Sequence, residues 1–216
     1  MVNRRRCATA AALLFLVLNG LFALAPWGTY RAVVVHHSAS QVADHHTIRR
    51  AHFARGWFET AYHLVLSNGS TGVPFGHLHP TLRYRLGLWS VATKSPRHNL
   101  TALHLVVVGN YEDGPMPGPL QDAVGHALGE ILKRHRIPED AVLLHRDCSA
   151  TACPGRHVDR DRLVAWSRRG PSAPADLRAQ HRRALGRLRL PPLGYGLAWT
   201  LANLGLAWGT RRLLRR

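Results

Sequence analysis

The sequence is poor in lysine, in acidic residues and in aromatic residues. Lys94 and Lys133 are its only lysines, yet 29 Lys and Arg residues against 12 Asp and Glu give the 216-residue chain a formal net charge of +17. Such a surplus favours anionic partners, such as acidic lipid headgroups or acidic wall polymers, although a solvated arginine-rich surface is the alternative. Aromatic residues make up 7% and do not alternate with a basic stripe, and no nucleic-acid-binding motif appears. We therefore expect no nucleic-acid partner.

Cysteine is also scarce, and the three present do not form a disulfide framework. Cys7 lies in an apolar N-terminal segment, where we expect it to behave as a small hydrophobic side chain. Cys148 and Cys153 are close enough in sequence to form a bridge. A thiolate of Cys153 can instead bind a metal, and a disulfide would remove that thiolate. The two interpretations exclude one another.

An apolar segment begins the chain. Three arginines at positions 4–6 precede a charge-free run to Ala25, the pattern of a signal sequence. The run is just long enough to span a bilayer of about 30 Å, and Pro26 disfavours cleavage after Ala25. We predict that residues 1–26 form an uncleaved signal anchor, with a cleaved signal peptide and secretion as the alternative. In either case the chain is exported, and an anchored domain would face the periplasm or outer wall space.

The other end of the chain is basic and then apolar. Residues 169–190 read as a basic linker and helix, and residues 191–216 are an apolar segment that ends in arginines. This segment is a candidate second membrane span, because arginines at both chain ends would then face the cytoplasm. An interfacial amphipathic helix and a helix packed on the domain are the alternatives.

Between these segments, residues 27–168 alternate between strand and helix patterns. The expected elements are strands at 31–35, 103–108 and 141–144, a strand near 62–66 closed by an Asn-Gly turn at 68–69, and helices at 41–55, capped from 38–40, and at 120–136. Such alternation predicts one α/β domain whose site lies at the strand ends.

Two segments more than a hundred residues apart carry side chains that bind zinc. In VVVHHSAS, a buried strand pattern ends in His36 and His37, and LLHRDCSATACPG carries His145 and Cys153. Zinc binds imidazole nitrogen and thiolate sulfur at about 2.0 to 2.3 Å, and a catalytic zinc keeps three protein ligands and one open position. We therefore predict a Zn²⁺ site formed by His36, His145 and Cys153.

Four strings occur in a characteristic order: VVVHHSAS, RGWFETAYHLVLSNG, HNLTALHLVVVGNYED and HRDCSATACPGR. Together they resemble the zinc N-acetylmuramoyl-L-alanine amidases, the superfamily of phage-lysozyme-type amidases and animal peptidoglycan recognition proteins. The resemblance covers residues 27–160 and implies a central mixed β-sheet flanked by helices, with zinc in an open cleft. It also implies hydrolysis of the amide between the lactyl group of N-acetylmuramic acid and L-alanine. The expected partner is peptidoglycan or a muropeptide, and we expect a monomer.

The resemblance assigns roles to individual residues. The family's zinc ligands fall on His36, His145 and Cys153, its tyrosine on Tyr62, and its threonine or lysine on Thr151. A tyrosine can hold the attacking water, although its usual pKa of about 10 makes it a poor base, and a threonine hydroxyl can stabilise the developing oxyanion.

Three further side chains lie within these motifs. We predict that His37 and His63 contact the substrate. We expect Asp147 to cap its loop by accepting hydrogen bonds from backbone N–H groups.

The chain also departs from the family pattern. Residues 87–96 lack a usual Gly-Ala-His segment, His104 stands where a glycine is usual, and residues 75–85 lack the expected substrate-loop pattern. These departures leave the three ligands intact but keep two alternatives open. One is a non-catalytic peptidoglycan-binding module on the same fold, and the other is a zinc amidohydrolase that acts on a different acylated amine.

Overall fold

The structure, a computed structural model, describes residue 17 and residues 29–169 and 173–186. Most of the predicted N-terminal anchor, including Cys7, and the whole C-terminal apolar segment lie outside the described residues. Within the described ranges, no helix is both long and apolar enough to cross a bilayer. The described residues 29–169 and 173–186 fall within one compact unit.

The centre of the domain is a five-stranded mixed sheet, which confirms the predicted fold class. Its strands are β1 (Ala32–His37), β2 (Leu64–Leu66), β3 (Leu78–Pro80), β4 (Ala102–Val107) and β5 (Val142–Leu144). The strand order is β3-β2-β4-β1-β5, and only β3 runs antiparallel to its neighbour. All six residues of β1 and of β4 are buried, as expected of central parallel strands covered on both faces.

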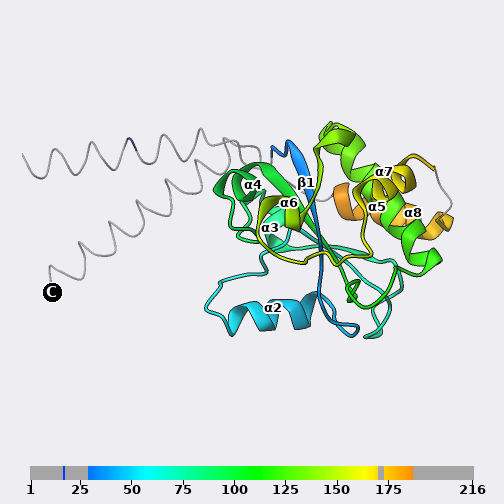
Figure 1. Cartoon of the computed structure of the whole chain (residues 1–216), viewed down its shortest axis with the longest axis horizontal. Coiled ribbons are helices and arrows are strands. Elements are labelled where there is room, and N and C mark those ends of the chain that lie inside the picture. Colours follow the sequence, from blue (N-terminus) through cyan, green and yellow to red (C-terminus); the bar gives the residue numbers. More distant parts are fainter. Residues whose placement is uncertain (1–16, 18–28, 170–172, 187–216) are drawn as a thin grey trace, which may run out of the picture. The chain divides into compact units, whose positions relative to one another are not determined.

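Helices cover both faces of this sheet. They are α2 (His45–Phe53), α3 (Leu82–Arg85), α4 (Pro96–Thr101), α5 (Gly118–His135), α6 (His145–Cys148), α7 (Arg160–Arg168) and α8 (Ala175–Gly186), with a 3₁₀ turn at Glu139–Ala141. Figure 1 shows α5, α7 and α8 together on one side of β1 and α2 on the other.

The larger part of the core lies under α5. Val124, Leu128 and Ile131 of this helix belong to the same hydrophobic cluster as Val33 and Val35 of β1, and all five side chains are fully buried. The helical spacing seen in the sequence is therefore confirmed. On the opposite face, a smaller cluster joins the α2 side of the domain to β2 and β4.

The predicted helix over residues 41–55 is shorter than expected and begins at His45. Asp44, not a serine at 38–40, is the N-cap, since its carboxylate accepts the Thr47 N–H while the Thr47 hydroxyl accepts the Asp44 N–H. The serines are used elsewhere: the Ser38 hydroxyl accepts the Gly109 N–H, and Ser40 forms an isolated β-bridge with Gly109. The segment after β1 is thus tied to the end of β4 before the helix can start.

The antiparallel edge strand β3 was not predicted, and it is covered by α8. The Gln180 side chain accepts a hydrogen bond from the Leu78 N–H at 3.0 Å and donates one to the Leu78 carbonyl at 2.9 Å. A helix appears where the basic pattern predicted one. Its amide side chain pairs with β3 as a neighbouring strand would, which protects the sheet edge.

Candidate metal centre

Two neighbouring parallel strands deliver the predicted histidine ligands to one edge of the sheet. The last register pair of β1 and β5 is Val35 with Leu144, and His36 and His145 each come one residue later. Their ring centroids lie 4.5 Å apart. Cys153 reaches them from the loop after α6, and one ligand atom from each of the three lies within 4.8 Å of the other two. The structure therefore brings all three predicted ligands together.

The nitrogen atoms of these histidines are suited to a metal. His36 Nδ1 lies 3.9 Å from Cys153 Sγ, close to the separation of about 3.5 Å that two donors have on a tetrahedral zinc. His145 Nδ1 is buried and has no hydrogen-bond partner in the part of the chain that the structure describes. A buried polar atom left unpaired is costly, whereas a metal ligand is not unpaired. The donor set thus fits zinc.

The protonation of the imidazoles is also suitable. Burial, reinforced by neighbouring histidines, holds the pKa of His36 well below its usual value, and burial lowers the pKa of His145 as well. Both rings are therefore neutral near pH 7, the form that binds a metal.

Both described cysteines are free, so the rival disulfide between Cys148 and Cys153 is not formed. Cys153 Sγ accepts a hydrogen bond from the His37 backbone N–H at 3.4 Å. Burial raises the pKa of this thiol to about 11, against which the hydrogen bond from His37 and the nearby Arg146 act. A bound zinc would replace the thiol proton.

Arg146 positions the loop that carries Cys153, a role that the sequence interpretation missed. Its N–H donates to the Cys153 carbonyl at 2.9 Å, and its guanidinium donates to the carbonyls of Gly155 and Val158. The HRD string could have indicated this role, because an arginine next to a predicted ligand is half-buried here and therefore needs hydrogen-bond acceptors. The expected loop-capping role of Asp147 is confirmed, since its carboxylate accepts the Leu144 N–H at 2.8 Å.

Gly155 lets this loop approach the segment after β4. Its φ is +100°, and a Cβ at this position would lie 2.3 Å from the carbonyl carbon of Tyr111. Only glycine fits there, so the CPG end of the motif serves packing as well as conformation.

Tyr62 lies beside two of the three predicted ligands, His36 and Cys153. Its ring centroid lies 5.0 Å from that of His36. Burial, with a smaller contribution from Cys153, raises the pKa of Tyr62 above its usual value, so its hydroxyl stays neutral. Thr151 is exposed in the loop before Cys153, and its Oγ1 accepts the Cys153 N–H at 3.2 Å. A hydroxyl that accepts one hydrogen bond can still donate its own proton to a ligand.

His37 and His63, which we predicted to contact the substrate, are both buried. His37 is 8% exposed, and its Nδ1 accepts the Tyr111 N–H at 3.2 Å on the face opposite His36. His63 is fully buried, and its ring nitrogens bond to the His104 N–H and the Leu88 carbonyl. Successive strand residues point to opposite faces, which takes His37 away from the open side.

His104 is the residue whose place in the site the sequence did not predict. It is fully buried on β4 and its Nδ1 lies 2.9 Å from His36 Nε2. Burial lowers its pKa to about 3. Its departure from the usual glycine was the signal, but only the structure shows what it touches.

The fold and this donor set define a class of protein, namely an α/β domain with a group of two histidines and one cysteine that could hold a metal ion at the carboxyl edge of its sheet. Within that class, the N-acetylmuramoyl-L-alanine amidase family model matches residues 26–156. The chain belongs to this family.

Relatives of both a catalytic and a recognition type share the fold. The chain is 22% identical over 150 residues to a peptidoglycan-recognition protein of Drosophila simulans, covering 65% of this chain and 76% of that protein. It superposes with a TM-score of 0.54 and 18% identity on the N-acetylmuramoyl-L-alanine amidase LysC from Clostridium intestinale, covering 63% of this chain and 84% of the other. Bumblebee PGRP-SA gives 0.50 and 15%, with coverages of 62% and 80%. At these identities the structural likeness establishes the fold.

Proposed function

We propose that this protein is a zinc-dependent N-acetylmuramoyl-L-alanine amidase that cleaves the amide between N-acetylmuramic acid and L-alanine in peptidoglycan or its fragments. The main support for this proposal is that one ligand atom from each of His36, His145 and Cys153 lies within 4.8 Å of the other two. In addition, His145 Nδ1 is buried and has no hydrogen-bond partner within the described part of the chain. Family membership supplies the substrate class.

Each residue of the candidate site would have a separate role in the proposed reaction. His36, His145 and Cys153 would hold the zinc, which when bound supplies a Lewis acid that polarises the amide carbonyl and lowers the pKa of water. Tyr62, with its raised pKa, would orient the attacking water by hydrogen bonding and would not itself take the proton. Thr151 would donate a hydrogen bond to the oxyanion that develops on the carbonyl oxygen.

The second candidate is a peptidoglycan-binding module that has kept the fold without hydrolysis. Recognition proteins among the relatives favour it, as do the exposed neutral hydroxyl of Thr151 and the altered segment 87–96. A pure binder has no need of an open metal position or of a tyrosine beside it, which is why we prefer the amidase. The zinc amidohydrolase acting on another acylated amine stays a third candidate.

The test is metal analysis and muropeptide digestion with the full-length chain, purified without chelator. About one zinc per chain and release of free stem peptide, seen by mass spectrometry, are expected of the amidase. Zinc with muropeptides bound but uncut would favour the binding module. Zinc with cleavage of a different acylated amine would favour the third candidate.

We further propose that the protein is exported and tethered to a membrane with the domain in the periplasm or outer wall space. The arginines and apolar run of residues 1–26 support this, and export would place the domain beside its polymer. Protease digestion of intact cells with a permeabilised outer layer, followed by membrane fractionation, tests it. Recovery in the soluble cytosol would contradict it.

A further inference from the structure

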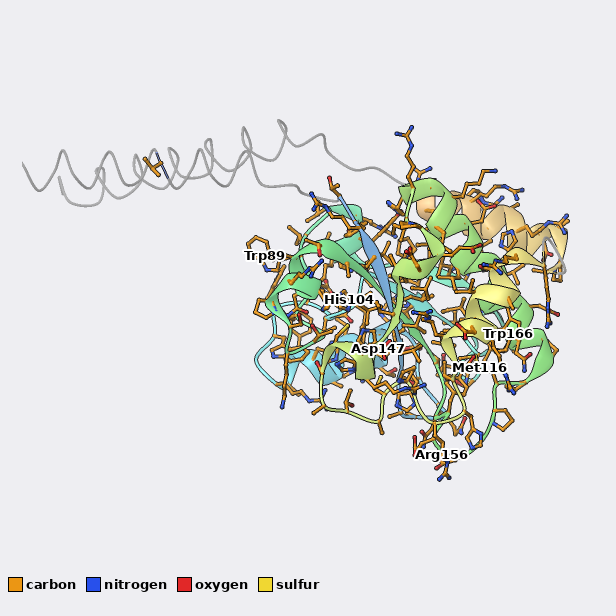
Figure 2. The ribbon with its side chains drawn as sticks, turned by 45° about the horizontal axis from the view of Figure 1, so that its top comes forward. Trp89, His104, Met116, Asp147, Arg156 and Trp166 are labelled. Carbon is orange, nitrogen blue, oxygen red and sulfur yellow. The ribbon has the colours of Figure 1, made fainter. Side chains whose placement is uncertain are left out.

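Behind the metal ligands lies a short chain of hydrogen bonds that ends on a backbone carbonyl. His36 Nε2 lies 2.9 Å from His104 Nδ1, and His104 Nε2 lies 3.1 Å from the His98 carbonyl oxygen. Both rings are fully buried, and Figure 2 shows His104 within the domain while Trp89 and Arg156 lie at its periphery. Water is thus kept from the two imidazoles.

The carbonyl fixes the direction of every hydrogen bond in this chain. A carbonyl can only accept, and its two lone pairs allow the His98 oxygen to accept from both the Ala102 N–H and His104 Nε2. His104 Nε2 must therefore carry the hydrogen, and in a neutral ring Nδ1 is then the acceptor. It follows that His36 Nε2 donates.

The opposite assignment leaves acceptors facing one another. If His36 Nε2 accepted a hydrogen from His104 Nδ1, the unprotonated His104 Nε2 would face the His98 oxygen at 3.1 Å. A buried pair of acceptors has no compensating bond. Only the first arrangement satisfies all the groups, and it leaves His36 Nδ1 with its lone pair, 3.9 Å from Cys153 Sγ.

A second histidine holds the main chain of His104 in place. The His104 N–H donates to His63 Nδ1 at 3.0 Å, and His63 Nε2 lies 2.8 Å from the Leu88 carbonyl oxygen. The carbonyl of Leu88 belongs to the altered segment 87–96, and the carbonyl of His98 belongs to α4, which begins where that segment ends.

We propose that His104 is a positioning residue that fixes the tautomer of His36 and thereby preselects Nδ1 as its metal-binding atom. Metal binding through Nδ1 rests on the proposed function, whereas the tautomer of His36 does not depend on it. Outer hydrogen-bond partners of this kind orient ligating histidines, and losing one typically weakens metal binding about 10- to 100-fold. The usual glycine at this position has no side chain to supply such a partner.

The experiment compares His104→Leu, His104→Gln and His181→Leu in the full-length chain. Glutamine can accept from His36 and donate to the carbonyl, whereas leucine can do neither. His181 is the matched control, because it is equally buried and bonds to His126 and the Gly76 carbonyl on the opposite side of the sheet. Zinc affinity is measured by competition with a chelating indicator, and the apo proteins are labelled with ¹⁵N-histidine to read each tautomer by long-range ¹H–¹⁵N correlation.

The expected result is an Nε2–H tautomer for His36 in the apo wild type. His104→Leu should lose this defined tautomer and bind zinc about 10- to 100-fold more weakly. His104→Gln should recover most of the affinity, and His181→Leu should keep it even where stability falls.

Two results would overturn the proposal: an Nδ1–H tautomer of His36 in the apo wild type, or wild-type zinc affinity in His104→Leu. If His104→Leu does not fold, the proposal is tested by the His36 tautomer of the apo wild type and by the zinc affinity of His104→Gln. If the wild type shows the expected tautomer but takes up no zinc, the proposed amidase function is refuted. The role of His104 in setting the tautomer of His36 would still hold.

Discussion

The backbone N–H of His37 donates a hydrogen bond to the sulfur of Cys153, across 116 residues of sequence. This bond joins the end of β1 to the loop after α6, so the residue next to His36 holds Cys153, another of the three proposed zinc ligands. It also explains why His37 matters to the site although its imidazole points to the other face.

Replacing Cys153 by Ser should abolish zinc retention and, with it, amidase activity. A neutral hydroxyl is a much weaker zinc ligand than a thiolate, so the loss should exceed the roughly 10- to 100-fold typical of an outer-shell change. Cys148→Ser is the matched control, since Cys148 is also a free thiol but does not belong to the three-residue group. Zinc content and muropeptide cleavage are measured for both, and an active Cys153→Ser protein would refute the assigned ligand set.

Tyr62→Phe should lower kcat by on the order of 10²-fold while zinc content stays at the wild-type level. The phenyl ring keeps the packing beside His36 and removes only the hydroxyl that would orient the water. Steady-state kinetics on a defined muropeptide, with metal analysis of the same preparation, is the measurement. If kcat were unchanged, Tyr62 would have only a packing role.

Arg146→Met should destabilise the loop that carries Cys153. Its guanidinium bonds to the carbonyls of Gly155 and Val158, and a hydrogen bond that involves a charged group contributes about 1.5 to 3 kcal/mol. We expect the free energy of unfolding to fall by about 2 to 3 kcal/mol and zinc affinity to fall with it. Arg156→Met is the control, because that side chain is 69% exposed and should change stability little. The measurement is denaturant titration of the apo and zinc-loaded forms of each variant. Equal losses of unfolding free energy in Arg146→Met and Arg156→Met would contradict the proposed role of Arg146 in holding the loop.

Gly155→Ala should be far more harmful than Gly56→Ala. Both glycines have positive φ, +100° and +79°, but a Cβ at position 56 has no heavy atom within 4 Å and one at position 155 overlaps the Tyr111 backbone. Gly56→Ala should cost about 1 kcal/mol of stability and spare the site, whereas Gly155→Ala should displace the loop and lower zinc affinity. Comparable zinc affinity in the two variants would contradict the packing role of Gly155.

Acid should weaken the attachment of α8 through His181. Burial lowers the pKa of His181 to about 4, so between pH 6.5 and about 4 the unfolded chain binds a proton there that the folded chain does not. The contribution of His181 to stability is therefore present above pH 6.5 and is lost as the pH falls toward 4.

The test is the change in unfolding free energy between pH 6.5 and 5.5. In His181→Gln the fall should be smaller than in wild type by up to about 1.4 kcal/mol, the value of one pKa unit. His157→Gln, at an exposed position, is the control. An equal fall in all three proteins would show that other buried histidines carry the acid sensitivity.

Much of the architecture could be predicted because the relevant signals are local. The valine run before His36 and the helical spacing from Val124 to Ile131 reflect one-dimensional periodicities that burial imposes on a strand and a helix. The edge strand β3 was missed since its three residues form a strand only by pairing with β2 and with Gln180, 102 residues away. The start of α2 was misplaced for a similar reason, because Gly109 holds the serines that were expected to cap it.

By itself, the sequence determined the family, the α/β class and the choice of His36, His145 and Cys153 as proposed zinc ligands, since these are matters of residue type, order and spacing. The tertiary structure decided which side chains face one another. It placed His37 and His63 inside the domain, joined Arg146 to the Cys153 loop and put His104 behind His36. These relationships are hydrogen bonds between segments that only the folded domain brings within about 3 Å, and hydrogen-bond direction depends on geometry that no local pattern encodes.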